Sequence, residues 1–207
     1  MLERIGKYKI QEQIGSGNQA TVYKAHDRDL DRTVAIKILH PYLYNDPKFR
    51  ELFFREARIA ASLNHPNVVT IYEVGEENNN IFIAMEFLPG TLDDEIQRFG
   101  KIDLPRALEI GRQIALALHA AHIRVNENGS PDPVVHRDIK PQNILFAEDG
   151  TFMLGFFGMA RSGLLPSGTT TFAGTPEYMS PEQCAWKPLD GRSDIYSVGI
   201  LLYQMLT

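Results

Sequence analysis

The hydrophobic pattern of the chain changes its period at Pro89-Gly90. Before this pair, short β-branched or alternating segments separated by turn residues predict strands over 8–15, 20–27, 33–39, 68–74 and 81–87. After it, apolar residues recur at three- and four-residue steps over 104–123, which predicts a buried helix. Because proline and glycine together interrupt regular structure, we expect an α+β chain of two parts, 1–87 and 88–207, with a hinge between them.

One helix is predicted inside the strand-rich part. Asp46-Pro47 begins it, because proline fits the first helical turn, and Phe49, Phe53 and Ala57 give it one apolar face. Residues 126–133 are turn-forming throughout and predict a surface loop. The apolar stretch 195–206 predicts a last helix, and it stops at Thr207 without a polar end, which predicts a truncated domain.

Composition excludes several classes of protein. A chain of 207 residues that is 43% hydrophobic can bury a sizeable core, and its formal charge of −5 argues against nucleic acid as a partner. The single cysteine, Cys184, excludes an internal disulfide and fits a reducing compartment. The N-terminus lacks the apolar segment of a signal peptide, and the stretch 195–206 is too short to span a bilayer. We therefore expect a cytoplasmic protein with no membrane segment.

Two motifs in the strand-rich part point to phosphate chemistry, and each has a plainer reading. Gly15, Ser16 and Gly17 lie between two predicted strands, where glycines let backbone N–H groups approach phosphate oxygens. The alternative is an ordinary glycine-rich hairpin. Lys37 lies inside an apolar strand segment and needs a partner if buried, for which Glu56 on the predicted helix is the candidate. The alternative is a lysine whose amine reaches the surface.

The segment His136-Arg137-Asp138-Ile139-Lys140-Pro141-Gln142-Asn143 carries the strongest signal. An aspartate can accept the proton of an attacking hydroxyl, a nearby lysine can steady a transferred phosphoryl group, and an asparagine oxygen can hold Mg²⁺. With the two upstream motifs, this segment resembles the catalytic loop of eukaryotic-like (Hanks-type) serine/threonine protein kinases, most of all bacterial members. Residues 174–182 (GTPEYMSPE) and 193–199 (SDIYSVG) resemble the family's activation-segment end and the helix after it.

The resemblance implies a bilobal fold, with an antiparallel sheet and one helix in the N-lobe, and a mostly helical C-lobe that lacks its last helices. It also implies ATP and Mg²⁺ (or Mn²⁺) as cofactors and a protein as substrate or regulatory partner. The implied catalytic residues are Asp138, Lys140, Asn143, Lys37 and Glu56, with Asn143 also a metal ligand. The implied nucleotide-binding residues are Ile14, Gly15, Ser16, Gly17, Val22, Ala35, Lys37, Met85, Glu86, Leu88 and Leu145.

Other family positions bear on specificity and control. Lys140 and Thr175 favour serine/threonine over tyrosine as the acceptor. Arg137 beside Asp138 implies control by phosphorylation of the activation loop, with candidate sites at 169–171, although a polar loop explains those threonines equally well. A small-molecule kinase of the same fold is a further alternative, against which the peptide-docking segment 174–182 argues.

The chain departs from the family at one decisive position. Phe156, before Phe157-Gly158, stands where the family places its metal-binding aspartate. A phenyl ring offers no oxygen to a hard cation, so the metal would keep only Asn143 as a protein ligand. Three functions therefore remain open: a serine/threonine kinase with impaired transfer, a pseudokinase that acts as a nucleotide-binding scaffold or allosteric partner, and a non-functional fragment.

Overall fold

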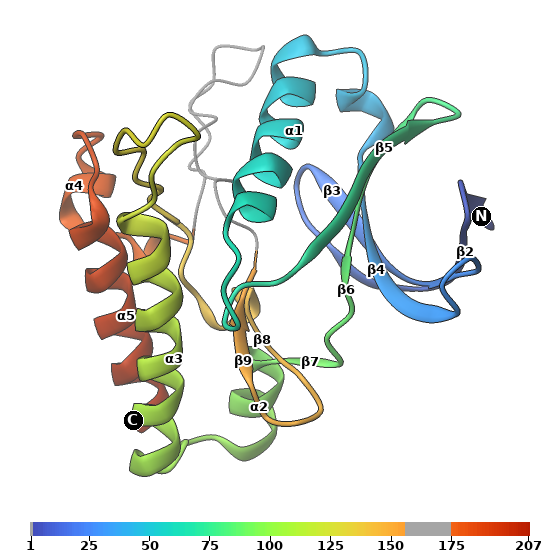
Figure 1. The fold of residues 1–207 in the computed structure, drawn as a ribbon. Coiled ribbons are helices and arrows are strands. Elements are labelled where there is room, and N and C mark those ends of the chain that lie inside the picture. The colour runs from blue at the N-terminus through green and yellow to red at the C-terminus, as the bar shows by residue number, and fades with distance from the viewer. Residues whose placement is uncertain (1, 156–174) are drawn as a thin grey trace. The chain divides into compact units, whose positions relative to one another are not determined.

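The computed structural model describes residues 2–155 and 175–207, and these form two compact units (Figure 1). The first comprises Met1–Ala61 and Thr70–Leu88, and the second comprises Ser62–Val69 and Pro89–Thr207. Our division of the sequence at 87/88 had assigned 62–69 to the first part. The segment belongs to the second unit because its backbone bonds there: Leu154 N–H donates to Asn67 O (2.8 Å) and Val69 N–H donates to Leu154 O (3.1 Å).

The first unit is built on one antiparallel sheet of six strands in the order β1-β2-β3-β4-β6-β5. The strands are β1 (Arg4–Ile5), β2 (Tyr8–Ser16), β3 (Ala20–Asp27), β4 (Arg32–Leu39), β5 (Ile71–Glu77) and β6 (Asn80–Glu86). One short 3₁₀ turn, η1 (Pro41–Leu43), and one long helix, α1 (Pro47–Ser62), follow β4.

Strand β4 is buried on both faces, and its two faces have different partners. Side chains alternate across a strand, so Val34, Ile36 and Ile38 share one face, where they are buried with Phe82 and Ala84 of β6 in one core cluster. The other face carries Ala35 and Lys37, both buried. A strand with two covered faces accounts for its almost uninterrupted apolar sequence.

Helix α1 confirms the periodicity expected from Asp46-Pro47. The Asp46 carboxylate accepts the Lys48 N–H (2.9 Å) and so satisfies one of the free donors at the start of the helix. Phe49, Phe53 and Ala57 are buried, and Glu56 lies among them on the same side.

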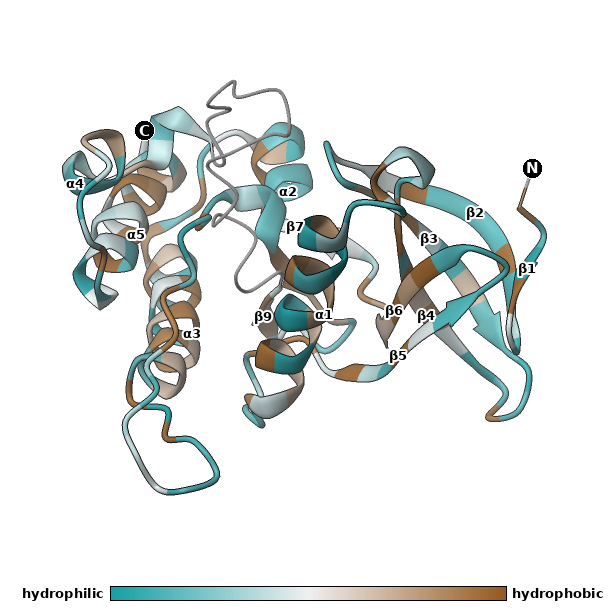
Figure 2. Cartoon of the chain, turned by 90° about the horizontal axis from the view of Figure 1, so that it is seen from above, coloured by the Kyte–Doolittle hydropathy of each residue, from teal (hydrophilic) through white to brown (hydrophobic). Residues whose placement is uncertain are grey.

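The second unit is mostly helical. Its elements are β7 (Gly90–Thr91), α2 (Leu92–Phe99), α3 (Leu104–His122), η2 (Pro141–Asn143), β8 (Ile144–Phe146), β9 (Phe152–Leu154), η4 (Pro176–Tyr178), α4 (Pro181–Cys184) and α5 (Gly191–Leu206). Helices α3 and α5 lie side by side (Figures 1 and 2). Most of the residues that α3 buries are apolar, and α5 buries both apolar and polar residues. Ile110, Ile114 and Leu118 of α3 and Leu201 and Met205 of α5 are almost fully buried.

Two expectations about the elements are corrected. The strand predicted over 68–74 begins only at Ile71, because Val68 instead forms an isolated parallel bridge with Leu154. Helix α2 was not expected, since its apolar content is low. It is held by local polar contacts, in which the Thr91 hydroxyl accepts the Asp94 N–H and the Asp94 carboxylate accepts the Thr91 N–H. None of the described helices is both long and apolar enough to cross a membrane.

Two glycines in contrasting surroundings give a test of this packing. A Cβ added at Gly75 would lie 2.5 Å from Phe82 Cζ, whereas one added at Gly199, inside α5, would meet no atom within 4 Å. We predict that Gly75→Ala lowers the free energy of unfolding by about 1–3 kcal/mol through overpacking. Gly199→Ala should raise it by about 0.5–1 kcal/mol, because alanine loses less backbone entropy in a helix.

Urea denaturation followed by circular dichroism measures both changes. A Gly75→Ala protein as stable as the parent would show that Phe82 can move aside without cost.

Candidate active site

Asp138 is the centre of a small buried polar cluster in the second unit. Its side chain is 9% exposed, and its Oδ2 accepts the Lys140 amine (2.9 Å) and the Asn143 amide nitrogen (2.9 Å). The Asn143 nitrogen also donates to the Asp138 backbone carbonyl (2.7 Å). The structure therefore brings together the three residues of the sequence motif HRDIKPQN that we had proposed as catalytic.

Lys140 connects this cluster to the segment after the activation loop. Its amine donates to Thr175 Oγ1 (3.1 Å) as well as contacting Asp138. The Thr175 hydroxyl thus holds the Lys140 amine beside the Asp138 carboxylate. The sequence had indicated Thr175 only as a residue that favours serine/threonine acceptors, and this contact gives it a structural role.

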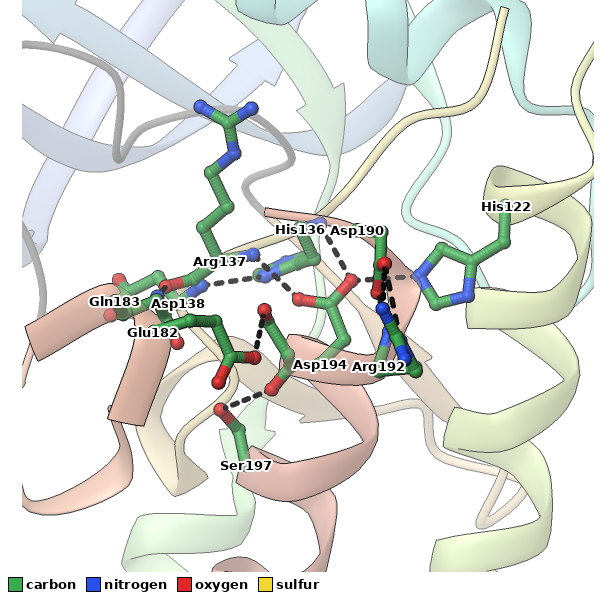
Figure 3. Close-up of polar contacts among 11 residues, drawn as sticks. His122, His136, Arg137, Asp138, Glu182, Gln183, Asp190, Arg192, Asp194 and Ser197 are labelled. Atoms are coloured by element: carbon green, nitrogen blue, oxygen red, sulfur yellow. Dashed lines mark hydrogen bonds and ion pairs between the residues drawn. The ribbon is translucent and has the colours of Figure 1, made fainter. Parts of the chain in front are cut away.

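A second carboxylate, Asp194 on α5, holds the backbone of the catalytic loop (Figure 3). Asp194 is completely buried and accepts three hydrogen bonds, each of 2.8 Å: from His136 N–H, from Arg137 N–H and from His122 Nε2. A fully buried carboxylate is stable only if hydrogen-bond donors compensate its charge, and these three donors do so. The loop, α3 and α5 are therefore joined at one side chain.

The bonds of His136 fix which ring nitrogen carries its proton. The Asp138 backbone N–H points at His136 Nδ1 (3.3 Å), so this nitrogen is the acceptor. Nε2 then carries the hydrogen and donates to the Gly155 carbonyl (2.7 Å). The buried imidazole thus links the catalytic loop to the residue that directly precedes Phe156.

Arg137 adopts a backbone conformation that is unusual for a residue with a side chain. Its φ is +73°, in the left-handed region, which costs of order 1 kcal/mol for a residue other than glycine. Asp194 accepts its N–H, and the Gln183 amide donates to its carbonyl (2.9 Å). Both ends of the residue are held, while Figure 3 shows its guanidinium directed away from Asp194.

The start of α5 positions Asp194 within its first turn. Asp190 caps the helix by accepting the Arg192 N–H (2.9 Å), and the hydrogen bonds from the Arg192 guanidinium hold the pKa of the Asp190 carboxyl at about 2. At Gly191 a Cβ would lie 2.5 Å from Nδ1 of His122. Glycine is therefore needed there for His122 to approach Asp194.

Glu182 of α4 also contacts α5. It accepts a hydrogen bond from the Ser193 hydroxyl (2.5 Å), and this bond lowers the pKa of the Glu182 carboxyl.

In the first unit, strand register collects the predicted nucleotide-binding residues on one sheet face. Lys37 pairs with Val22, and Ala35 pairs with Met85. Because paired residues share a face, and so do residues two apart in a strand, all four lie on the face opposite the core of Val34. Lys37 is 3% exposed there and forms an ion pair of 2.6 Å with Glu56, which is 7% exposed. The predicted pairing is present, and the surface-lysine alternative is excluded.

The remaining predicted nucleotide residues have more varied surroundings. Gly15 and Ser16 are the last two residues of β2, and Gly17 begins the turn to β3, where its N–H donates to Ala20 O (2.9 Å). Ile14 lies at a register shift of β2 and is 44% exposed, so it is not part of a packed wall within the first unit. The other three are Glu86 at the end of β6, the buried Leu88, and Leu145 in β8 of the second unit.

Comparison with known proteins assigns the family. Residues 8–207 match the protein kinase domain family. The chain belongs to this family. The kinase domain is 42% identical over 205 residues to the serine/threonine-protein kinase PrkC of Bacillus subtilis, covering 98% of this chain and 30% of that protein. It is 38% identical over 210 residues to the serine/threonine-protein kinase PknB of Mycobacterium tuberculosis, with 97% and 32% covered.

The fold comparison agrees with this assignment. The crystal structure of the PknI kinase domain of M. tuberculosis matches with a TM-score of 0.74 and 26% identity, covering 100% of this chain and 75% of that one. The expected bilobal α+β kinase fold is thereby confirmed. The chain spans about 30% of the length of the curated relatives named here.

The side chains of the described residues do not fit the metal site that the family implies. In residues 2–155 and 175–207 there is no group of three or more His, Cys, Asp or Glu side chains able to hold a metal ion. Asn143 directs its amide nitrogen to Asp138, so its carbonyl oxygen faces the other way and offers one ligand. Phe156 and the candidate phosphorylation sites at 169–171 lie outside the described residues.

Sequence reasoning missed the residues that position the catalytic loop of the kinase domain: Asp194, His122 and Gln183. One signal was available, because Asp194 directly precedes the apolar stretch 195–206, and a carboxylate that is buried beside such a stretch requires donors. His122 and Gln183 carried no such signal, since a histidine or glutamine near a helix end is common.

The Asp194 contacts predict a specific loss in a variant. Asp194→Asn keeps the shape but puts an N–H₂ group opposite donors, so the kinase domain should lose about 1.5–3 kcal/mol of unfolding free energy. The backbone amides of His136 and Arg137 should also exchange faster with deuterium. Urea denaturation and hydrogen-exchange mass spectrometry measure the two effects.

Asp190→Asn in the same turn is the matched control. Asparagine caps helices as well as aspartate, so this variant should keep the parent's midpoint and exchange rates. If the two variants had the same urea midpoint and the same exchange rates at His136 and Arg137, Asp194 would not be what holds the loop.

Proposed function

We propose that this chain binds ATP and transfers its γ-phosphoryl group to serine or threonine hydroxyls of a protein, at a rate lowered by Phe156. The observation that carries the proposal is the arrangement of Asp138, Lys140 and Asn143, in which one buried carboxylate oxygen is held by an amine and an amide. Support also comes from the family, whose named bacterial relatives are serine/threonine kinases.

Asp138 would act as the proton acceptor. Lys140 and Asn143 both contact Oδ2, and they fix the plane of the carboxylate. We assign Oδ1 as the atom that accepts the proton of the attacking hydroxyl. Lys140, held between Asp138 and Thr175, would place its positive charge beside the transferred group.

The first unit would hold the nucleotide. ATP supplies an activated phosphoryl group, and the chain's part is to bind and orient it. Ala35 and Met85 offer an apolar patch of the sheet face to the base, and the backbone of Glu86 and Leu88 would bond its polar edge. Lys37, held in an ion pair with Glu56, would pair with the phosphates.

Phe156 determines how fast the transfer is. Phosphoryl transfer depends on positioning and charge neutralisation, and a site without its metal-binding carboxylate loses part of the latter. Each 1.4 kcal/mol of lost stabilisation slows the reaction about tenfold, so a deficit of several kcal/mol costs a few orders of magnitude.

A second candidate follows from the same residue. If transfer is abolished, the chain is a pseudokinase that binds nucleotide and acts as a scaffold or allosteric partner of another protein. Both versions of the proposal include a protein partner, either a substrate or a regulatory protein. Both also place the chain in the cytoplasm.

Restoring the carboxylate tests the proposal. Transfer of labelled γ-phosphate from ATP to a generic serine/threonine substrate should rise at least about a hundredfold in Phe156→Asp, because a metal ligand of the required chemistry returns. The parent should show a signal above the Asp138→Asn blank.

The controls separate the two versions. A parent equal to the blank, with recovery in Phe156→Asp, would establish the pseudokinase. A Phe156→Asp protein that binds ATP but transfers nothing would refute the metal argument.

A further inference from the structure

The tip of the glycine-rich loop, residues 17–19 between β2 and β3, accepts hydrogen bonds from the residues that follow β4. His40 Nε2 lies 2.8 Å from Gly17 O, and the His40 backbone N–H donates to Gln19 O (2.8 Å). The Tyr42 hydroxyl donates to Asn18 O (2.6 Å). Three consecutive carbonyls of the loop are thus bound by two residues of one turn.

That turn is itself well fixed. Leu43 N–H donates to His40 O (2.9 Å), and Leu43 is 7% exposed, which anchors η1 in the first unit. The His40 and Tyr42 rings stack with centroids 5.4 Å apart and an interplanar angle of 20°. Tyr42 is 71% exposed, so its ring is held mainly by this stacking and by its hydroxyl.

The direction of these carbonyls sets the direction of the neighbouring amides. In a planar trans peptide, the C=O of one residue and the N–H of the next point in opposite directions. Bonds to the carbonyls of Gly17 and Asn18 therefore turn the N–H groups of Asn18 and Gln19 away from His40 and Tyr42. Glycine at 17 would otherwise let the first of these planes rotate with little cost.

The contacts have little to contribute to folding. The carbonyls at the tip are exposed, and water can satisfy them if the side chains are removed, so each bond adds little net stability. Their main physical effect is to reduce the number of conformations of the loop. A backbone anion site gains affinity when its N–H groups are already oriented.

We propose that His40 and Tyr42 are positioning residues that hold the glycine-rich loop with its Asn18 and Gln19 amides oriented for nucleotide phosphates. The inference rests on the proposed function, since it requires that this loop binds ATP. Neither side chain needs to touch the nucleotide, because both act through the carbonyls of the loop.

Comparing ligands with and without phosphates tests the inference. Isothermal titration of the whole chain with ATP and with adenosine gives two affinities for each protein. His40→Ala and Tyr42→Phe should each weaken ATP binding about threefold to tenfold, the equivalent of one modest hydrogen bond, and leave adenosine binding unchanged. His40→Gln, which keeps an N–H donor, should recover much of the ATP affinity.

Tyr44→Phe is the matched control. It removes a hydroxyl from the residue that follows η1, but this hydroxyl donates to Glu76 and not to the loop. It should change neither affinity, and melting curves of all variants should coincide with that of the parent.

The outcomes separate the two hypotheses. A parent that binds neither ligand would overturn the proposed function together with this inference. A parent that binds ATP, with variants whose ATP affinity is unchanged or whose adenosine affinity falls equally, would overturn the positioning role alone.

Discussion

The burial of the Asp194 carboxylate is the constraint on which the second unit depends. A charge in that position is stable only while three donors remain directed at it, and two of them are consecutive backbone N–H groups of the catalytic loop. The same hydrogen bonds supply the donors that the carboxylate needs and fix the backbone of the loop. The left-handed φ of Arg137 can persist because these bonds, with that from Gln183, leave it no alternative.

In the first unit the equivalent constraint is strand register. A shift by one residue between β3 and β4 would carry Lys37 to the core face and Ile36 and Ile38 to the opposite face, and it would separate Lys37 from Glu56. The apolar core therefore fixes the position of a charged residue that it does not contain. The sheet face that is predicted to bind nucleotide and the apolar core are coupled in this unit through the alternation of side chains along β4.

Much of this could be predicted from the sequence, and the limits are physical. Strands β3 and β4 and helices α1 and α3 follow from short-range patterns. The Lys37–Glu56 pair was one of two interpretations of a lysine in an apolar strand, and the structure shows that it forms. Val68 was misassigned because an apolar β-branched residue does not reveal which partner it pairs with, and its partner Leu154 is distant in sequence. His40 gave no signal either, because its role depends on a turn that brings it back to the loop between β2 and β3. For the candidate site, the motif residues could be named in advance, but the side chains that support them could not.

Gly191 has a consequence for how this domain can vary. The His122 ring occupies the space in which any other residue at 191 would place its Cβ. A larger residue at 191 is compatible with the fold only if position 122 becomes smaller, and a smaller residue there gives up its bond to Asp194. The two positions, far apart in the chain, are therefore expected to change together during evolution or not at all. Substitution at either position alone would weaken the contacts that hold the backbone of the catalytic loop, although neither residue belongs to that loop.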